Sequence, residues 1–348
     1  MSESPEAVRT SLAAAITLKL EPGRFHRDAK LTGLNLLLTY DKGCSANCSY
    51  CGLAREREAT EETFIRVKWP TYELEEIVER THEAPELRRV CVGTITHPKA
   101  LQDTTAIMER FRSDGRLKIS GLISPTLIKK REDLEALKEA GAERLGIAID
   151  AATEELFDHH RGGGVKGPHR WEKYWSVVKE AVAVFNPGMI GVHLVVGLGE
   201  TEEDMIRTIQ HAHDLGALTH LFSFYPEEGS RLENEAPPPL GHYRRVQLAR
   251  YLVNENLGRY EDMTFNHAGQ LTSFGQDIEP FLATGAAFQT SGCPDHQGRV
   301  DCNRPYGNER PSEPIRNYPF APTAEDLADI RSQLWQGLEV ESLAENRT

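Results

Sequence analysis

Apolar, β-branched runs alternate with helical patterns along most of this chain, and this alternation limits the folds that it can adopt. Eight runs are typical of buried strands, and the stretches between them have apolar residues three and four positions apart, as in amphipathic helices. The expected strands are Asn35–Tyr40, Arg89–Thr94, Lys118–Ile123, Arg144–Ile149, Ile190–Val196, His220–Tyr225, Met263–Asn266 and Ala286–Thr290. Strands separated by single helices form right-handed parallel βαβ units. The sequence therefore predicts an α/β fold, either a (β/α)8 barrel of the TIM type or an open six-stranded version with added elements.

The periodicity also indicates where the domains begin and end. The expected helices are Tyr72–His82, Thr105–Phe111, Glu132–Ala140, Trp171–Val184, Glu202–Leu215, Tyr243–Asn254 and a last helix from Ala324 to about Leu338. We expect a helical, polar N-terminal leader in residues 1–30 and the barrel in residues 31–290. Residues 291–348 form a C-terminal extension, which begins with a stretch rich in Pro, Gly, Asn and Arg.

Charge and hydropathy exclude several classes of partner. The formal net charge of −13 argues against nucleic acid or an anionic membrane as the main partner. No apolar run approaches the roughly 20 residues needed to span a bilayer, and the N-terminus lacks the features of a secretory signal. We therefore expect a cytoplasmic protein, in which the six cysteines are metal ligands or reactive thiols rather than disulfides.

Three of these cysteines, Cys44, Cys48 and Cys51, follow the first expected strand in one short loop. Their C-x3-C-x2-C spacing lets three thiolates converge on three irons of a [4Fe–4S] cubane, which leaves the fourth iron without a protein ligand. The rival is a structural zinc site, which usually has C-x2-C pairs and a fourth ligand. The loop resembles the signature of the radical S-adenosylmethionine (SAM) superfamily. That resemblance implies that SAM binds the fourth iron, that an electron from the cluster cleaves it to a 5′-deoxyadenosyl radical, and that Tyr50 lies beside the adenine.

The resemblance also implies SAM contacts at the ends of later strands. The segment Val92-Gly93-Thr94 stands where superfamily members receive the methionine amine on backbone groups, although an ordinary strand end would look the same. The segment from Gly197 to Glu200 resembles the glycine motif of biotin synthase, in which glycines let the adenine lie close to the backbone. Glycines at a strand-to-helix turn are also often structural.

Three charged residues are further candidates for binding SAM or the substrate. Asp150 ends the fourth expected strand, as an Asp does in biotin synthase, and is a candidate for the ribose or the substrate. A lone Asp there is equally typical of a helix cap. Arg161 and Arg170 are candidates for the SAM carboxylate, because arginine binds carboxylates through two hydrogen bonds. The sequence does not choose between these two arginines.

From about residue 30 to 290 the chain resembles biotin synthase, including Cys91 on the second expected strand and the stretch Glu228–Leu232. Biotin synthase holds a second cluster through cysteines on strands two, three and five and an arginine on a later strand. The corresponding positions here are near Ser120, Gly191 and Phe265, so only Cys91 is kept. The same second cluster therefore cannot be built in the same way.

The last two cysteines, Cys293 and Cys302, lie in the segment Cys293–Arg310. This segment and the first expected strand resemble the two-component lipoyl synthases. The resemblance implies sulfur insertion into an octanoyl chain on a lysine of a carrier domain, with a partner radical SAM subunit and an external electron donor. Cys91, Cys293 and Cys302 would then hold a second iron–sulfur cluster, with Ser291 or Arg304 as candidates for the fourth ligand.

Other interpretations remain open at this stage. The chain could be a single-cluster radical SAM enzyme for rearrangement or C–C chemistry on a small molecule, an enzyme that inserts sulfur as biotin synthase does, or a metal-binding scaffold. Cys91 could be an ordinary buried cysteine and the other two incidental thiols. The basic residues Arg299, Arg304 and Arg310 could meet carboxylates of a carrier protein or simply be solvated.

Overall fold

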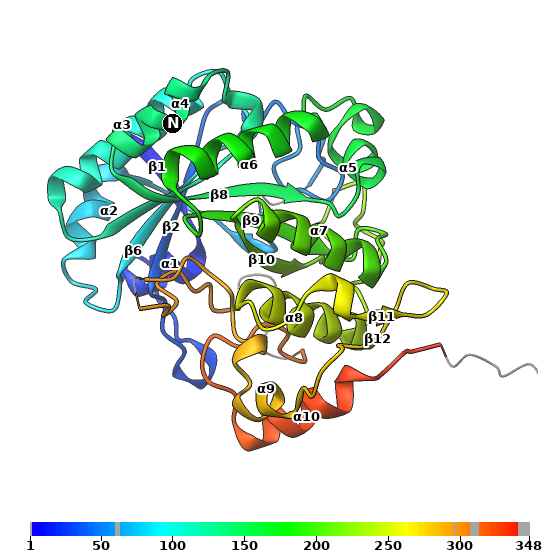
Figure 1. Ribbon diagram of the computed structural model, residues 1–348. Helices are drawn as coiled ribbons and strands as arrows, with labels where there is room; N and C mark the ends of the chain where they lie inside the picture. Colours follow the sequence, from blue (N-terminus) through cyan, green and yellow to red (C-terminus); the bar gives the residue numbers. More distant parts are fainter. Residues whose placement is uncertain (1, 60–62, 296, 307–312, 340–348) are drawn as a thin grey trace, which may run out of the picture.

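A twisted eight-stranded sheet forms the centre of the computed structural model, which describes residues 2–59, 63–295, 297–306 and 313–339 (Figure 1). The strand order is β10-β9-β8-β7-β6-β2-β1-β5. Six strands run parallel: β2 (Gly33–Leu38), β6 (Arg89–Gly93), β7 (Lys118–Ile123), β8 (Ala142–Asp150), β9 (Ile190–Val196) and β10 (Leu218–Ser223). Two short strands, β1 (Ala7–Thr10) and β5 (Thr71–Glu73), extend the sheet antiparallel beyond β2.

Helices follow the parallel strands and cover one face of the sheet (Figure 1). They are α2 (Leu74–Thr81), α3 (Ala100–Asp114), α4 (Arg131–Glu139), α5 (Glu154–Arg161), α6 (Trp171–Phe185), α7 (Glu202–Asp214) and α8 (Leu240–Asn254). Short helices α1 (Leu12–Thr17) and α9 (Glu279–Thr284) and the last helix α10 (Ala324–Leu334) complete the fold. Local sequence explains several starts: Thr201 accepts a hydrogen bond from the Asp204 backbone N–H at the beginning of α7.

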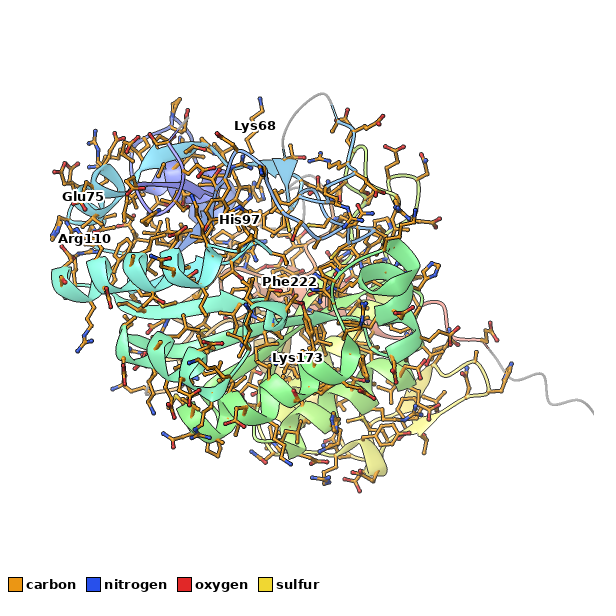
Figure 2. The ribbon with its side chains drawn as sticks, turned by 90° about the horizontal axis from the view of Figure 1, so that it is seen from above. Lys68, Glu75, His97, Arg110, Lys173 and Phe222 are labelled. Carbon is orange, nitrogen blue, oxygen red and sulfur yellow. The ribbon has the colours of Figure 1, made fainter. Side chains whose placement is uncertain are left out.

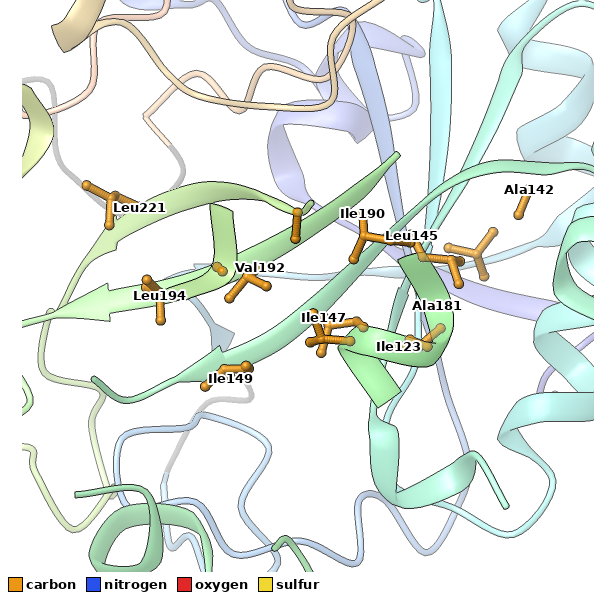
Figure 3. Close-up of a cluster of buried hydrophobic side chains, with 14 of the residues drawn as sticks. Ile123, Ala142, Leu145, Ile147, Ile149, Ala181, Ile190, Val192, Leu194 and Leu221 are labelled. Atoms are coloured by element: carbon orange, nitrogen blue, oxygen red, sulfur yellow. The ribbon is translucent and has the colours of Figure 1, made fainter. Parts of the chain in front are cut away.

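The hydrophobic core lies between the sheet and these helices (Figure 3). On β8 and β9, alternate residues such as Ile147, Val192 and Leu194 point toward the helices and are fully buried. Burying one aliphatic side chain of this size contributes about 1.5–3 kcal/mol, so this layer fixes which face of each strand meets the helices. Residues at the alternate positions of the strands must then point to the opposite, concave side; they include Cys91 on β6, Ser120 on β7 and His193 on β9. The sheet thus directs its polar side chains toward its interior.

The α/β class and the TIM-type fold are confirmed, and the first six strands lie where the sequence predicts them, within a few residues. The two remaining sheet strands come from the N-terminal part rather than from the predicted seventh and eighth runs. Residues Thr264–Phe265 form β11, which pairs with β12 (Leu271–Ser273) in a separate hairpin, and Ala286–Phe288 form a 3-10 helix. The seventh predicted strand, Thr264–Phe265, pairs with a strand only a few residues away, and the sheet edge beside β2 is already occupied by β1.

The N-terminal segment also differs from the predicted helical leader. Helix α1 is present, but residues 7–10 form β1, with Ala7 and Val8 fully buried. Four residues are too few for a pattern that distinguishes a strand from a helical turn. At the other end, α10 returns to this segment, where the Arg27 guanidinium forms an ion pair of 2.7 Å with the Asp326 carboxylate. Among the described residues, no helix has both the length and the apolar character needed to cross a membrane.

Candidate functional site

A cavity of about 230 Å³ opens where the parallel strands end. In barrels of parallel strands this is the edge where loops gather and chemistry takes place. Much of its wall is apolar and comes from strand ends and from the loops that follow them. Its apolar lining includes Leu37, Leu53, Phe64, Ile95, Leu122, Ile123, Val195, Phe222 and Phe224.

The three loop cysteines, Cys44, Cys48 and Cys51, all line this cavity, as the sequence predicts for a cluster site. Backbone N–H groups already point at two of the sulfurs: Thr96 N–H donates to Cys44 Sγ and Leu53 N–H to Cys51 Sγ, both at 3.4 Å. Such donors favour thiolates, which are the form that binds metal.

Three thiols without a fourth protein ligand are the donor set that a cubane takes in a radical SAM loop, one for each of three irons. Among the residues that the structure describes, no three His, Cys, Asp or Glu side chains are grouped closely enough to hold one ion. A cubane instead spreads its three thiolates over three irons, so its ligands stand farther apart than those of zinc. Burial raises the pKa of the Cys48 and Cys51 thiols, and a bound metal would reverse that effect.

Tyr50, Asp150 and Arg161 form a connected polar group on the same cavity wall. The Tyr50 hydroxyl donates to Asp150 Oδ2 at 2.6 Å, and Arg161 Nη1 lies 3.2 Å from the same oxygen. Arg161 Nη1 also donates to the backbone carbonyl of Ile149 at 2.7 Å, whereas its buried Nε has no partner. The group therefore offers a carboxylate, a hydroxyl and an unsatisfied guanidinium N–H beside the cysteine loop.

The structure distinguishes between the two candidate arginines. Arg161 lines the cavity, while Arg170 donates to the carbonyls of Gly167 and His169 and does not reach it. Gly93 and Thr94 line the cavity at the end of β6, but Val92 is fully buried on the other face of the strand.

Gly197 and Glu200 also lie away from the cavity. The Glu200 carboxylate accepts hydrogen bonds from the backbone N–H groups of Gly197 and Leu198, at 2.7 and 2.9 Å. Gly197 has a φ of 106°, which other residues rarely adopt. Burial raises the pKa of Glu200 to about 7. These contacts stabilise the turn after β9. They correspond to the structural role of the glycine motif, which the sequence left open as the alternative to a contact with the adenine.

A buried imidazole that the sequence did not single out connects the cysteine loop to this turn. His160 Nδ1 lies 2.7 Å from the Ser49 hydroxyl, and His160 Nε2 lies 2.8 Å from the Leu198 carbonyl. Because a carbonyl only accepts, Nε2 carries the proton and Nδ1 accepts from Ser49. His160 lies on α5, a helix missing from the sequence prediction, so no pattern identified it.

The second group of cysteines, Cys91, Cys293 and Cys302, also comes together, deeper in the interior of the sheet. Cys91 interacts electrostatically with Cys293, and Cys302 interacts with both. Ser120 lies directly beside Cys91 in the sheet, and its hydroxyl donates to the Val90 carbonyl at 3.3 Å. All six cysteines are free, and burial raises the pKa of the Cys91 thiol to about 11.

The C-terminal extension reaches this position from the N-terminal ends of the strands (Figure 1). Cys302 lies against Gly33, the first residue of β2, where an added Cβ would be 2.7 Å from its sulfur. The buried Asp301 carboxylate forms an ion pair with Lys118 Nζ at 2.9 Å, and Asn303 Oδ1 accepts from the Thr32 N–H at 2.8 Å. These anchoring contacts were absent from the sequence prediction.

The remaining tail candidates have distinct positions. Arg304 lines the cavity, Ser291 Oγ accepts a hydrogen bond from the Leu221 N–H, and Arg299 pairs with Asp295 at 2.7 Å near the surface. Arg310 lies outside the described residues. Two histidines that the sequence did not single out, His169 and His193, also line the cavity, and burial lowers the pKa of His169 to about 2.

Comparisons with known proteins agree with this geometry. A family model described as the radical SAM superfamily matches residues 40–212. A methylornithine synthase structure aligns with a TM-score of 0.51 at 16% identity, covering 70% of this chain and 67% of that chain. HydG, a maturase of the [FeFe]-hydrogenase, aligns with a TM-score of 0.50 at 14% identity, covering 71% of this chain but only 54% of that chain. At these identities the likeness concerns the fold alone. No curated protein matches the sequence.

Proposed function

This chain carries a radical SAM domain, and from that premise we propose that it inserts sulfur into an octanoyl chain on a carrier protein, as one subunit of a lipoyl synthase. Cys44, Cys48 and Cys51 would hold the SAM-binding [4Fe–4S] cluster. When bound, the cluster and SAM supply the radical that removes hydrogen from an unactivated C–H bond. The reaction specific to this chain then depends on what lies beside the cavity.

The observation that carries the proposal is the convergence of Cys91, Cys293 and Cys302 beneath the cavity. Replacing C–H by C–S requires a sulfur source close enough to trap the carbon radical before it reacts elsewhere. Three cysteines from a strand and a distant tail, with Cys302 buried and Cys91 and Cys293 partly buried, have no structural need to meet, since each could be replaced by an apolar residue of similar size. Their meeting point fits the ligand set of a second iron–sulfur cluster that donates sulfur.

The cavity walls suit the proposed substrate. The aliphatic and aromatic side chains of Leu122, Val195, Phe222 and Phe224 favour an uncharged hydrocarbon chain, because burying polar groups against them would be costly. Tyr50 and Arg161 gather the polar groups at the cysteine-loop side, where the nucleotide part of SAM would lie. An octanoyl chain would thus extend between the SAM position and the second group of cysteines.

The proposal includes three partners: the octanoylated carrier domain, a second radical SAM subunit and an external electron donor. The cysteines motivate the first test, in which iron and sulfide are counted in anaerobically reconstituted protein. Two cubanes predict about eight irons, falling to about four in the Cys44→Ala/Cys48→Ala/Cys51→Ala variant and to about four in the Cys91→Ala/Cys293→Ala/Cys302→Ala variant.

The second test follows the reaction itself. An octanoylated carrier domain is incubated with reductant and SAM, with and without the partner subunit, and the carrier is examined by mass spectrometry. Mass gained as sulfur, lost in the second triple variant while 5′-deoxyadenosine still forms, would support sulfur insertion. About four irons in the wild type, together with activity that survives loss of Cys293 and Cys302, would refute it and favour a single-cluster rearrangement.

A further inference from the structure

His169, directly before α6, brings a buried imidazole to the cavity wall. Only 2% of the residue is exposed, yet its side chain is part of the cavity lining. Its Nδ1 lies 2.7 Å from the Thr126 hydroxyl and 2.9 Å from the Tyr174 hydroxyl. The Tyr174 hydroxyl in turn lies 3.2 Å from the Ser124 hydroxyl, and Ser124 also lines the cavity. One phenol therefore connects His169 to Ser124 at the end of β7.

The hydrogen bonds of this imidazole assign its proton. Burial lowers the pKa of His169 to about 2, so the ring is neutral and only one of its nitrogens carries a proton. A phenol is a better donor than acceptor, so we assign the Tyr174 proton to the bond with Nδ1, and the ring proton to Nε2. Among the described residues this Nε2–H has no acceptor, and unlike Arg161 Nε it is not fully enclosed. A neutral N–H donor is thus left accessible at the cavity wall.

Ser124 supplies the complementary group. Because the Tyr174 proton is used on His169, the bond between Ser124 and Tyr174 takes the Ser124 proton, and the Ser124 oxygen keeps lone pairs for an outside donor. The wall therefore offers one donor and one acceptor, which are joined through Tyr174. A secondary amide presents the matching pair, since its carbonyl oxygen accepts and its N–H donates. A carboxylate would instead favour Arg161, because hydrogen bonds from a charged donor are stronger.

We propose that the His169 Nε2–H and the Ser124 hydroxyl bind the amide that joins the octanoyl chain to the carrier lysine. The inference rests on the proposed function, because it requires that chain as the substrate. Every carbon of the chain is a fixed number of bonds from the amide, so holding the amide determines which carbon reaches the SAM side. The apolar wall that would receive the chain includes Phe222, which lies near the middle of the molecule (Figure 2). His169 and Ser124 are therefore specificity-determining residues, and Thr126 and Tyr174 hold the imidazole in place.

The test is a binding cycle in which a polar group is removed from the protein and its partner is removed from the ligand. Full-length protein, reconstituted with iron and sulfide and supplied with SAM but no reductant, is titrated anaerobically with two ligands. These are Nα-acetyl-Nε-octanoyl-lysine and its trans-alkene isostere, which lacks the amide. The ratio of the two dissociation constants measures the preference for the amide, and general effects of a substitution cancel in that ratio. His169→Phe should reduce the preference about tenfold.

Two histidine variants serve as controls. His169→Gln restores an N–H group near the position of Nε2 and should keep the preference within about twofold of the wild type. His159→Gln makes the same change at an exposed imidazole on α5 and should also leave the preference within about twofold.

The outcomes separate the inference from the function on which it rests. An unchanged amide preference in His169→Phe would overturn the inference and leave sulfur insertion intact. Should His169→Phe fail to fold, Thr126→Val decides, because it removes one anchor of the imidazole and should reduce the preference about threefold; an unchanged preference there would overturn the inference as well. Binding of Nα-acetyl-lysine to the wild type as tightly as its octanoylated form would contradict the proposed substrate, and with it both proposals.

Discussion

A single methyl group at position 33 should expel the C-terminal extension from the barrel. A Cβ on Gly33 would lie 2.7 Å from Cys302 Cα and 2.7 Å from Cys302 Sγ. Comfortable contacts between such atoms are about 3.5–4.0 Å, so the tail backbone must move by about 1 Å. Side-chain rotation cannot relieve the contact with a backbone atom, and the β2 backbone at Gly33 is held by its pairing with Arg89 of β6.

The expected magnitude follows from two comparisons. Overpacking a well-filled site costs about 1–3 kcal/mol, which weakens docking of the tail by about 5-fold to 150-fold. A metal site tolerates shifts of only about 0.2 Å in its ligand distances, far less than the required movement. Gly33→Ala should therefore reduce the iron content from about eight to about four, with the SAM cluster retained. Cleavage of the tail by trypsin should also become faster.

A matched control separates this clash from general strain in the tail. Gly298→Ala adds the same methyl group within the extension, at a left-handed residue with a φ of 78°, but nothing lies within 4 Å of the added atom. An alanine in this left-handed conformation costs about 1–2 kcal/mol, which is comparable with the overpacking cost of Gly33→Ala. Wild-type iron content and wild-type proteolysis in Gly33→Ala would refute the placement of Cys302 against β2.

Three further perturbations test other parts of the site. His160→Phe leaves the Ser49 hydroxyl without its partner and should lower the free energy of unfolding in urea by about 1–3 kcal/mol. An unchanged free energy of unfolding would show that the hydrogen bond between His160 and Ser49 does not stabilise the cysteine loop. Tyr50→Phe removes the 2.6 Å bond to Asp150 and should weaken SAM binding in anaerobic equilibrium dialysis by about tenfold, whereas unaltered affinity would separate this pair from SAM. Burial lowers the pKa of His169 to about 2, so below pH of about 6.5 the unfolded chain binds a proton that the folded chain does not. The free energy of unfolding should therefore decrease as the pH is lowered, by up to about 1.4 kcal/mol per pH unit. His169→Gln should reduce this slope in thermal melts between pH 7 and 5.

Patterns that repeat along the chain were the most predictable part of the fold. The strands Lys118–Ile123 and Ile190–Val196 coincide with β7 and β9, because long β-branched runs bounded by polar residues have few alternative structures. The cysteine loop was equally accessible, since its three ligands lie within eight residues of one another. Local spacing was therefore enough to predict that these three cysteines lie together, and all three line one cavity.

Features that depend on distant partners were less accessible. Gly197 and Glu200 form a motif in the sequence, yet only the folded turn shows that the Glu200 carboxylate accepts a hydrogen bond from the Gly197 backbone N–H. His160 became visible only when α5 was placed beside the cysteine loop. The meeting of Cys302 with Cys91 was expected from resemblance alone, because no local rule predicts a contact over two hundred residues apart.

The entry of the tail from the N-terminal ends of the strands has a consequence for biogenesis. The contact between Asn303 and Thr32 spans 271 residues, so it forms only after nearly the whole barrel has left the ribosome. Until then the floor of the barrel is open, and Cys91 is exposed to whatever delivers iron and sulfide. The C-terminal segment thus closes the floor of the barrel last, and under the proposed function the order of synthesis would let the second cluster be assembled before the extension covers it.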